Sequence, residues 1–219
     1  MDYLIIFSSV ADKKPIKIYI NRKGSLVILV SLIKYPDKDR SMQRFRLANA
    51  DLKETVLRGS IKQVRALLAR PGIDVNQQYH DGWTVLLYLV FNECTDRVAV
   101  LLAHDGINVN YQNHSGVTAL MFAASFGYHT IVTQLLACEG LDVNQQDNSG
   151  QTALMRAVHA GYLEIVQQLL DHSSIDITLK NREGNTAEEC MMRLEGPYND
   201  RVEALKELFE SYRTCPYLK

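Results

Sequence analysis

Histidine and cysteine are the residues of this 219-residue sequence best suited to bind a metal or act as a nucleophile. His80 and His114 stand 34 residues apart, at the same place in two similar segments. Stacked helical segments lie about 8–10 Å apart, whereas a zinc ligand lies about 2 Å from its metal. The two imidazoles are therefore not expected to share an ion. We predict no metal site.

The four cysteines form no C-x-x-C pair, and we interpret them as reduced thiols. Motifs of known catalytic chemistry are also absent: the sequence has no G-x-x-x-x-G-K-[ST], no G-x-S-x-G and no H-E-x-x-H. The first fifty residues hold neither histidine nor cysteine. We therefore predict no catalytic residue, no cofactor and no enzyme activity.

The elements that carry these residues recur every 34 positions. The recurring residues are Gly82, Gly116, Gly150 and Gly184; Thr84, Thr118, Thr152 and Thr186; and the leucine pairs that begin at Leu67, Leu101, Leu135 and Leu169. Several columns in register at one fixed period identify a repeat array.

Each unit has a simple physical interpretation. The turn "DNSG" has Asp first and Gly fourth, as a type I turn prefers, and Thr152 can then cap a short helix, "TALMRAVHA". Gly161 ends that helix, and "LEIVQQLLD" has the apolar spacing of an amphipathic second helix. One such unit cannot bury its apolar face alone, but stacked neighbours can.

The stretch "NHSGVTALMFAASFGYHTIVTQLLACEGLDVN" resembles the ankyrin repeat, and the resemblance covers about Asn49 to Arg213. It implies a mainly α fold: a solenoid of helix-turn-helix units with β-turn fingers. We expect about five units, at residues 47–79, 80–113, 114–147, 148–181 and 182–213, followed by a tail, residues 214–219. The resemblance also implies a protein partner on a concave face made by the fingers and first helices.

The sequence departs from the family pattern in several columns. The histidine that ties neighbouring ankyrin repeats by hydrogen bonds is replaced by Leu87, Met121, Met155 or Glu189, so we expect apolar contacts to take its place. Glu93 stands where other units have glycine, which predicts a distorted corner between two helices. The terminal units are atypical, as expected for caps with polar outer faces.

The sequence of residues 1–46 predicts a small β-rich segment. This segment resembles no family. "IKIYIN", the turn "NRKG" and "SLVILVSLIKY" suggest a β-hairpin, with "YLIIFSSV" as a third strand. The segment could cap the first repeat, pair through a dimerising edge strand, or act as a recognition hairpin. Residues 1–50 carry a net charge of +6 against −7 for the rest. A basic face could attract acidic protein, RNA or anionic lipid, and its predicted residues are Lys13, Lys14, Lys17, Arg22 and Lys23.

Positions that the repeat fold leaves free are the candidates for partner binding. Trp83, the only tryptophan, occupies one of them, and Trp, Tyr and Arg dominate binding hot spots. We expect replacement of Trp83, Phe91 and Phe126 by alanine to abolish partner capture with little effect on unfolding. The predicted binding residues are His80, Asp81, Trp83, Tyr88, Phe91, Asn92, His114, Ser115, Val117, Phe122, Phe126, Asn148, Gln151, Arg156, His159 and Arg182.

Three asparagines in the same column, Asn76, Asn110 and Asn144, each follow a valine and have a leucine eight residues before them. This pattern resembles the site that asparaginyl hydroxylases modify in ankyrin repeats. The alternative is that each asparagine hydrogen-bonds within its own turn.

The function that these observations favour is a non-catalytic adaptor for protein–protein interaction. The alternative is an adaptor that contacts nucleic acid or an anionic membrane through basic residues within 13–46, acting as a host-directed effector, because the repeat style resembles ankyrin proteins of protists and intracellular bacteria. The longest apolar run, Leu26 to Ile33, is shorter than the ~20 residues of a membrane span. With no evident signal peptide, we expect a monomer in the cytoplasm, with the nucleus or a host cytosol as alternatives.

Overall fold

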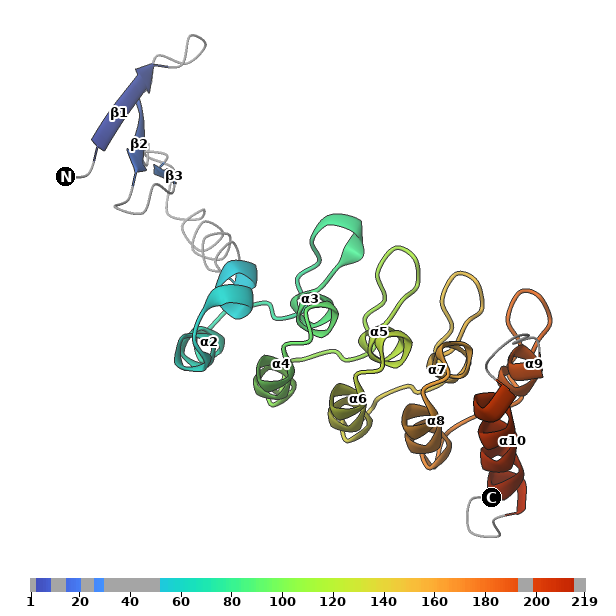
Figure 1. The fold of residues 1–219 in the computed structure, drawn as a ribbon. Helices are drawn as coiled ribbons and strands as arrows, with labels where there is room; N and C mark the ends of the chain where they lie inside the picture. The colour runs from blue at the N-terminus through green and yellow to red at the C-terminus, as the bar shows by residue number, and fades with distance from the viewer. Residues whose placement is uncertain (1–2, 9–14, 21–25, 30–51, 193–198, 215–219) are drawn as a thin grey trace. The chain divides into compact units, whose positions relative to one another are not determined.

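The computed structural model describes residues 3–8, 15–20, 26–29, 52–192 and 199–214. The chain divides into two compact units, Met1–Arg46 and Leu47–Lys219. Each unit has its own secondary structure, strands in the first and helices in the second (Figure 1).

The first unit contains three antiparallel strands in the order β1 (Tyr3–Ser8), β2 (Pro15–Ile20) and β3 (Leu26–Leu29). Lys17 lies in β2, opposite Ile6 of β1 and Leu29 of β3. The other four residues of the predicted basic face lie outside the described residues, so that face stays a prediction. The roles considered for the segment also stay predictions.

The second unit stacks its helices in two layers, which Figure 1 shows from the side. One layer contains α3 (Val85–Phe91), α5 (Ala119–Phe126), α7 (Ala153–Ala160) and α9 (Ala187–Met192), packed in series. The other contains α2 (Ile61–Leu68), α4 (Thr95–Leu102), α6 (His129–Leu136), α8 (Leu163–Leu170) and α10 (Asn199–Thr214). Residues 52–58 form a further helix before α2. The predicted mainly helical repeat array is confirmed.

Threonine side chains fix where the first helices begin. The hydroxyl oxygens of Thr84, Thr118 and Thr152 accept hydrogen bonds from backbone N–H groups three residues on, at 3.4, 3.2 and 3.2 Å. Each hydroxyl satisfies one of the backbone donors that a helix N-terminus leaves unpaired. The three threonines are buried, so this capping bond is shielded from water. The predicted capping role of Thr152 is confirmed.

The corners after α3, α5 and α7 have a left-handed backbone. Gly127 and Gly161 adopt φ of 80° and 74°, and Glu93 adopts 53° in the equivalent place. The hydrogen bond that closes the corner is also kept, from the Cys94 N–H to the Leu89 carbonyl at 2.9 Å. The predicted distortion at Glu93 is therefore wrong, because glutamate takes the glycine conformation and bears its steric cost.

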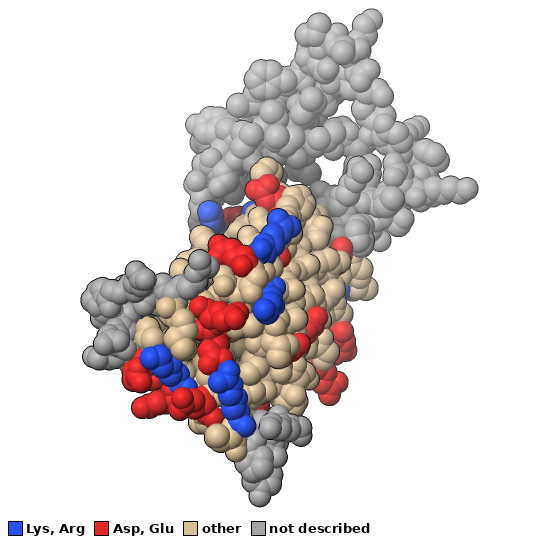
Figure 2. Space-filling model, turned by 90° about the vertical axis from the view of Figure 1, so that its right-hand side faces the viewer, with Lys and Arg blue, Asp and Glu red and all other residues tan. Residues whose placement is uncertain are grey.

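The hydrophobic core lies between the two layers and runs the length of the array. The leucine column at Leu67, Leu101, Leu135 and Leu169 is buried throughout. At the C-terminal end, Phe209 of α10 is fully buried, and the first-layer helix α9 is held by an ion pair from Glu188 to Arg213. Figure 2 shows acidic and basic side chains interspersed over this end of the array, as expected for a cap that faces water.

An asparagine ladder links the units. The side-chain amide of Asn110 donates to the Gly140 carbonyl at 2.7 Å, and its oxygen accepts from the Asp142 N–H at 2.9 Å. Asn76 and Asn144 make the same pair of bonds to the unit that follows. Leu87, Met121 and Met155 are buried in the core, as expected for apolar contacts in place of the histidine, and the asparagine ladder adds hydrogen bonds between repeats.

Candidate functional site

Seven aromatic side chains form a continuous cluster, which we call the aromatic patch. Trp83 is at its centre, with ring centroids 5.0 Å from Tyr88, 5.5 Å from Phe91 and 5.1 Å from Phe122. The remaining members connect through these rings at 5.8 to 6.2 Å. The complete patch comprises Tyr79, Trp83, Tyr88, Phe91, Phe122, Phe126 and Tyr128.

The patch lies on one side of the first helix layer, because Tyr88 and Phe91 belong to α3 and Phe122 and Phe126 to α5. On these helices the other face is filled by buried residues such as Leu89 and Ala123. Edge-to-face and stacked ring pairs are worth about 0.5–1.5 kcal/mol beyond their buried area. The rings are therefore packed against one another before any partner arrives.

Exposure differs sharply among the rings. Phe91 and Phe126 are 49% and 45% exposed, whereas Trp83 is half-buried. Large apolar side chains with this much exposed surface commonly mark interaction sites when they lie together. Trp83 instead supports its neighbours, so replacing it by alanine would remove several ring contacts. The small effect on unfolding expected for the joint replacement of Trp83, Phe91 and Phe126 stays a prediction.

A cation sits at the N-terminal edge of the patch. The ammonium of Lys53 lies 3.8 Å from the centroid of the Tyr88 ring and 5.4 Å from that of Tyr79. Burial raises the pKa of the Tyr79 phenol, and its hydrogen bond with the backbone of Lys53 opposes this rise. Sequence reasoning missed Lys53 and Tyr79, because only the packing of the first repeat (residues 47–79) against the second brings them to the rings.

Polar residues continue the surface toward the C-terminus. Arg156 of α7 forms an ion pair with Asp147, whose side chain is only 5% exposed, and donates a hydrogen bond to the Ser125 hydroxyl at 3.1 Å. Asp147 also accepts from the Ser149 and Gln151 N–H groups. Arg156 was predicted to serve a partner, but in the structure it holds a finger to its helix. His159 is exposed on the same helix.

The finger tips are joined by backbone bonds from each tip to the one before it. The N–H groups of His114, Asn148 and Arg182 donate to carbonyls of the preceding tip at 2.9 to 3.0 Å. Their side chains stay exposed, and in the first finger His80 lies 2.7 Å from the Asp81 carboxylate. A row of polar side chains therefore borders the aromatic patch.

The structure divides the predicted binding residues by exposure. Val117 is a correction, since it is only 7% exposed and belongs to the core. Half-buried are Trp83, Tyr88, Phe122, Gln151 and Arg156. Exposed are His80, Asp81, Phe91, Asn92, His114, Ser115, Phe126, Asn148, His159 and Arg182. Partner binding by any of them stays a prediction.

The three predicted hydroxylation candidates are the asparagines of the ladder. Asn76, Asn110 and Asn144 are half-buried, and both ends of each side-chain amide bond to the following unit. This differs from the expected bond within the same turn. Hydroxylation of these residues stays a prediction. It would act on side chains that link one repeat to the next.

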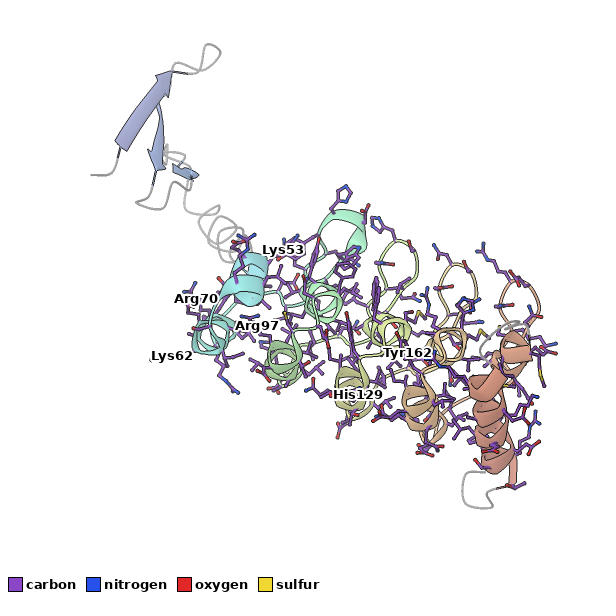
Figure 3. All side chains as sticks on the ribbon, in the orientation of Figure 1. Lys53, Lys62, Arg70, Arg97, His129 and Tyr162 are labelled. Atoms are coloured by element: carbon purple, nitrogen blue, oxygen red, sulfur yellow. The ribbon has the colours of Figure 1, made fainter. Side chains whose placement is uncertain are left out.

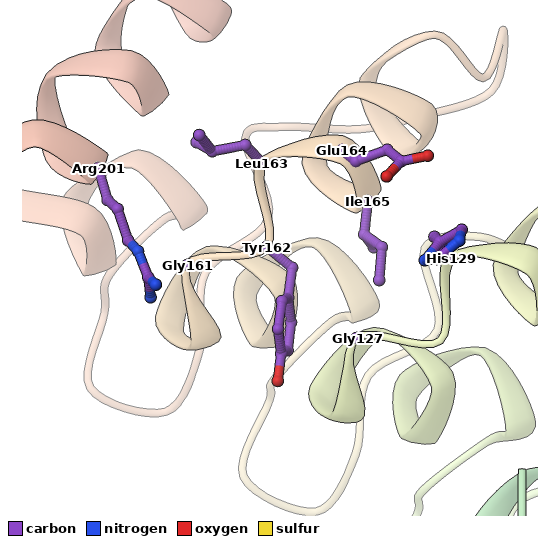
Figure 4. Close-up of a pocket in the computed structure, with 8 residues that line it drawn as sticks. All are labelled: Gly127, His129, Gly161, Tyr162, Leu163, Glu164, Ile165 and Arg201. Carbon is purple, nitrogen blue, oxygen red and sulfur yellow. The ribbon is translucent and has the colours of Figure 1, made fainter.

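A separate cavity of about 230 Å³ lies where the corners of two units meet, near Tyr162 (Figure 4). His129, Glu164 and Arg201 line it, and all three are exposed. Catalytic sites usually hold their charges in dry, fixed positions, which this cavity lacks. Across the described residues, no cluster of three or more His, Cys, Asp or Glu is arranged to hold a metal.

Cys94 and Cys138 form no disulfide, and burial raises the pKa of the Cys138 thiol. Cys215 lies outside the described residues. No helix in the described part of the chain is both long and apolar enough to cross a membrane.

Comparison with known proteins agrees with the helical pairs and fingers of the second unit. A family model described as ankyrin repeats, three copies, matches residues 52–147, 106–181 and 129–213. No curated protein matches the chain. The family match extends over most of the chain and covers the units that carry the aromatic patch. This chain therefore belongs to the ankyrin repeat family.

Proposed function

We propose that this protein is a non-catalytic adaptor that binds another protein through the aromatic patch and the bordering finger tips. Ankyrin repeats are generally protein–protein interaction modules, and solenoids use extended concave surfaces for binding. The observation that supports the proposal most directly is the exposure of Phe91 and Phe126 side by side, with ring centroids 6.0 Å apart.

The aromatic patch has the features of a binding hot spot. Hot spots are centred on large aromatic anchors, surrounded by contacts that exclude water. Here the half-buried rings of Trp83 and Phe122 pack against the exposed phenylalanines. Phe91 and Phe126 therefore have little side-chain freedom to lose on binding. The polar finger tips supply the hydrogen-bonding rim that such interfaces usually have.

The double variant Phe91→Ala/Phe126→Ala tests this function. Each exposed ring can contribute 2 kcal/mol or more if it is a hot spot, so we expect loss of partner capture in affinity purification with the tagged full chain. Unfolding monitored by circular dichroism should change little, because both rings are already about half exposed. Trp83 is left in place to keep the patch intact.

Met192→Ala is the matched control. Met192 of α9 is 57% exposed and lies outside the aromatic patch. It should capture the same proteins as the wild type. Partners that bind the double variant as well as the wild type would exclude the aromatic patch as the binding surface.

The alternative function, contact with nucleic acid or anionic membrane, depends on the basic charge of residues 1–50. Phosphate contacts lose affinity steeply as salt rises, whereas a patch of rings should bind with weak salt dependence. Binding to the captured partner at about 50 and 200 mM salt therefore separates the two functions.

A further inference from the structure

Lys53 places a positive charge at the edge of the aromatic patch, and no carboxylate of the described residues pairs with it. Its ammonium rests on the faces of Tyr88 and Tyr79, and no ion pair of Lys53 is found within the described part of the chain. Lys53 is half-buried, and a ring face attracts a cation by about 0.5–1 kcal/mol at exposed sites and about 2 kcal/mol when desolvated. The ammonium therefore keeps its charge and its capacity to donate hydrogen bonds.

Three carboxylates near the patch lie beside basic side chains. Glu54 pairs with Arg58 at 3.1 Å, Asp81 with His80 at 2.7 Å, and Asp147 with Arg156. Among the residues that the structure describes, Lys53 is thus a cation without an ion-pair partner. An anionic group on a ligand would complement it.

The cation and the apolar surface are connected through touching rings. From Lys53 the contacts pass to Tyr88, then Trp83, then Phe91, and end at Phe126. This path leads from the helix at residues 52–58 through α3 to α5, one helix from each of three successive units. Because such helices are about 10 Å apart and an extended chain advances about 3.3 Å per residue, roughly six residues would span it.

We propose that the aromatic patch receives an acidic peptide segment of its protein partner. A carboxylate of the segment pairs with the Lys53 ammonium, and a large apolar side chain of the same segment covers Phe91 and Phe126. The inference rests on the proposed function and adds the chemistry of the partner to it.

A single-stranded nucleic acid could also stack its bases on rings, but the charges favour the peptide. Nucleic-acid binding uses several cations, one for each phosphate that is neutralised. Here Lys53 is accompanied by the acidic residues Glu54 and Asp81, and Arg156 is already paired. One carboxylate suits this arrangement better than a row of phosphates.

The test is a selection of random 12-residue peptides displayed on phage against the full chain. We expect the wild type to enrich peptides in which Asp or Glu lies a few residues from a large apolar residue. Against Lys53→Glu, the enriched peptides should carry Lys or Arg in place of the acid. The best wild-type peptide should bind Lys53→Glu at least about tenfold more weakly, the loss of one charge-assisted contact.

Two further variants separate charge from packing. Lys53→Met keeps the hydrocarbon stem over Tyr88, so it should remove the preference for acids without reversing it. Lys62→Glu makes the same charge change at an exposed residue of α2, away from Lys53 (Figure 3), and should leave the selected peptides unchanged. Melting curves of all variants check that the fold is kept.

The outcomes distinguish this inference from the function beneath it. Peptides without acidic preference, or peptides that keep their affinity for Lys53→Glu, would overturn the inference if Phe91→Ala/Phe126→Ala still abolishes their binding. Peptides that bind the double variant normally, or no enrichment at all, would count against the proposed function itself. A fluorescent 12-residue oligothymidine that binds the wild type and is lost in Lys53→Glu would replace the peptide with nucleic acid.

Discussion

Residues at equivalent positions of different repeats have different roles in this protein. Phe91 and Phe126 present apolar surface, while Trp83 holds the rings together and Val117, in the same column as Trp83, is buried. Glu93 shows the same point for the backbone, because it performs the turn that Gly127 and Gly161 perform elsewhere. A column therefore specifies a position in the fold, and the neighbours decide what the side chain does there.

Replacing Glu93 by glycine should stabilise the protein. The left-handed conformation costs an L-residue about 1–2 kcal/mol, and the extra chain entropy of glycine cancels part of this gain. We expect a net increase of roughly 0.5–1 kcal/mol in the free energy of unfolding, measured in urea. Glu139→Gly is the control, since Glu139 has no positive φ and its change should destabilise slightly. A Glu93→Gly protein no more stable than the wild type would show that other contacts of glutamate offset the strain.

Elements in the array depend on links that repeat from unit to unit. The asparagine ladder joins the loops that follow successive second helices, and the finger bonds join successive turns. The ladder ends at Thr178, which bonds to Asp176 in its own turn. These hydrogen bonds hold the second and third repeats together. The first helices of these repeats, α3 and α5, carry the two halves of the aromatic patch.

Asn110→Ala should weaken the joint between two units. It removes two side-chain hydrogen bonds, one to the Gly140 carbonyl and one from the Asp142 N–H, and two such bonds together contribute about 1–3 kcal/mol. We expect a loss of that size in the free energy of unfolding. Asn148→Ala, which removes one side-chain bond at an exposed tip, should cost less. Equal losses in the two variants would mean that the ladder contributes no more than a surface bond.

The sequence predicts these elements well because their causes are local. A capping threonine, a left-handed glycine and a leucine column each act within one unit, so their spacing reveals them. Contacts between units are less visible: nothing near Lys53 in the sequence points to Tyr88, and Asn110 bonds to groups 30 and 32 residues away. The positions of Tyr88, Phe91, Phe122 and Phe126 in one cluster agree with the predicted face, while the pairing of Arg156 with Asp147 could not be foreseen from a column of variable residues.

At the scale of the whole repeat array, the free energy of unfolding should be distributed along the stack of repeats. Solenoid units contact only their neighbours, so an end unit is held from one side alone. At the C-terminus α10 supplies this support by packing on α8 and α9. Most of the aromatic patch lies in the second and third repeats, away from that end.

Phe209→Ala should therefore loosen one end of the array and spare the patch. Removing a fully buried phenylalanine costs about 3–5 kcal/mol. Hydrogen exchange should show the earliest loss of protection in α9 and α8, with α3 and α5 still protected. Leu208→Ala, at a half-buried position on the same helix, should have a smaller effect. Uniform loss of protection along the array would indicate that the units unfold as one.

Trp83 is the only tryptophan of the chain, and it lies in contact with both exposed and half-buried rings of the patch. Indole emission depends on the water around the ring, and here a single indole stands beside the surface that a partner would cover. The protein thus carries its own optical probe at the place of interest. Its intrinsic fluorescence can follow occupancy of the patch in solution, without a label and without interference from another tryptophan.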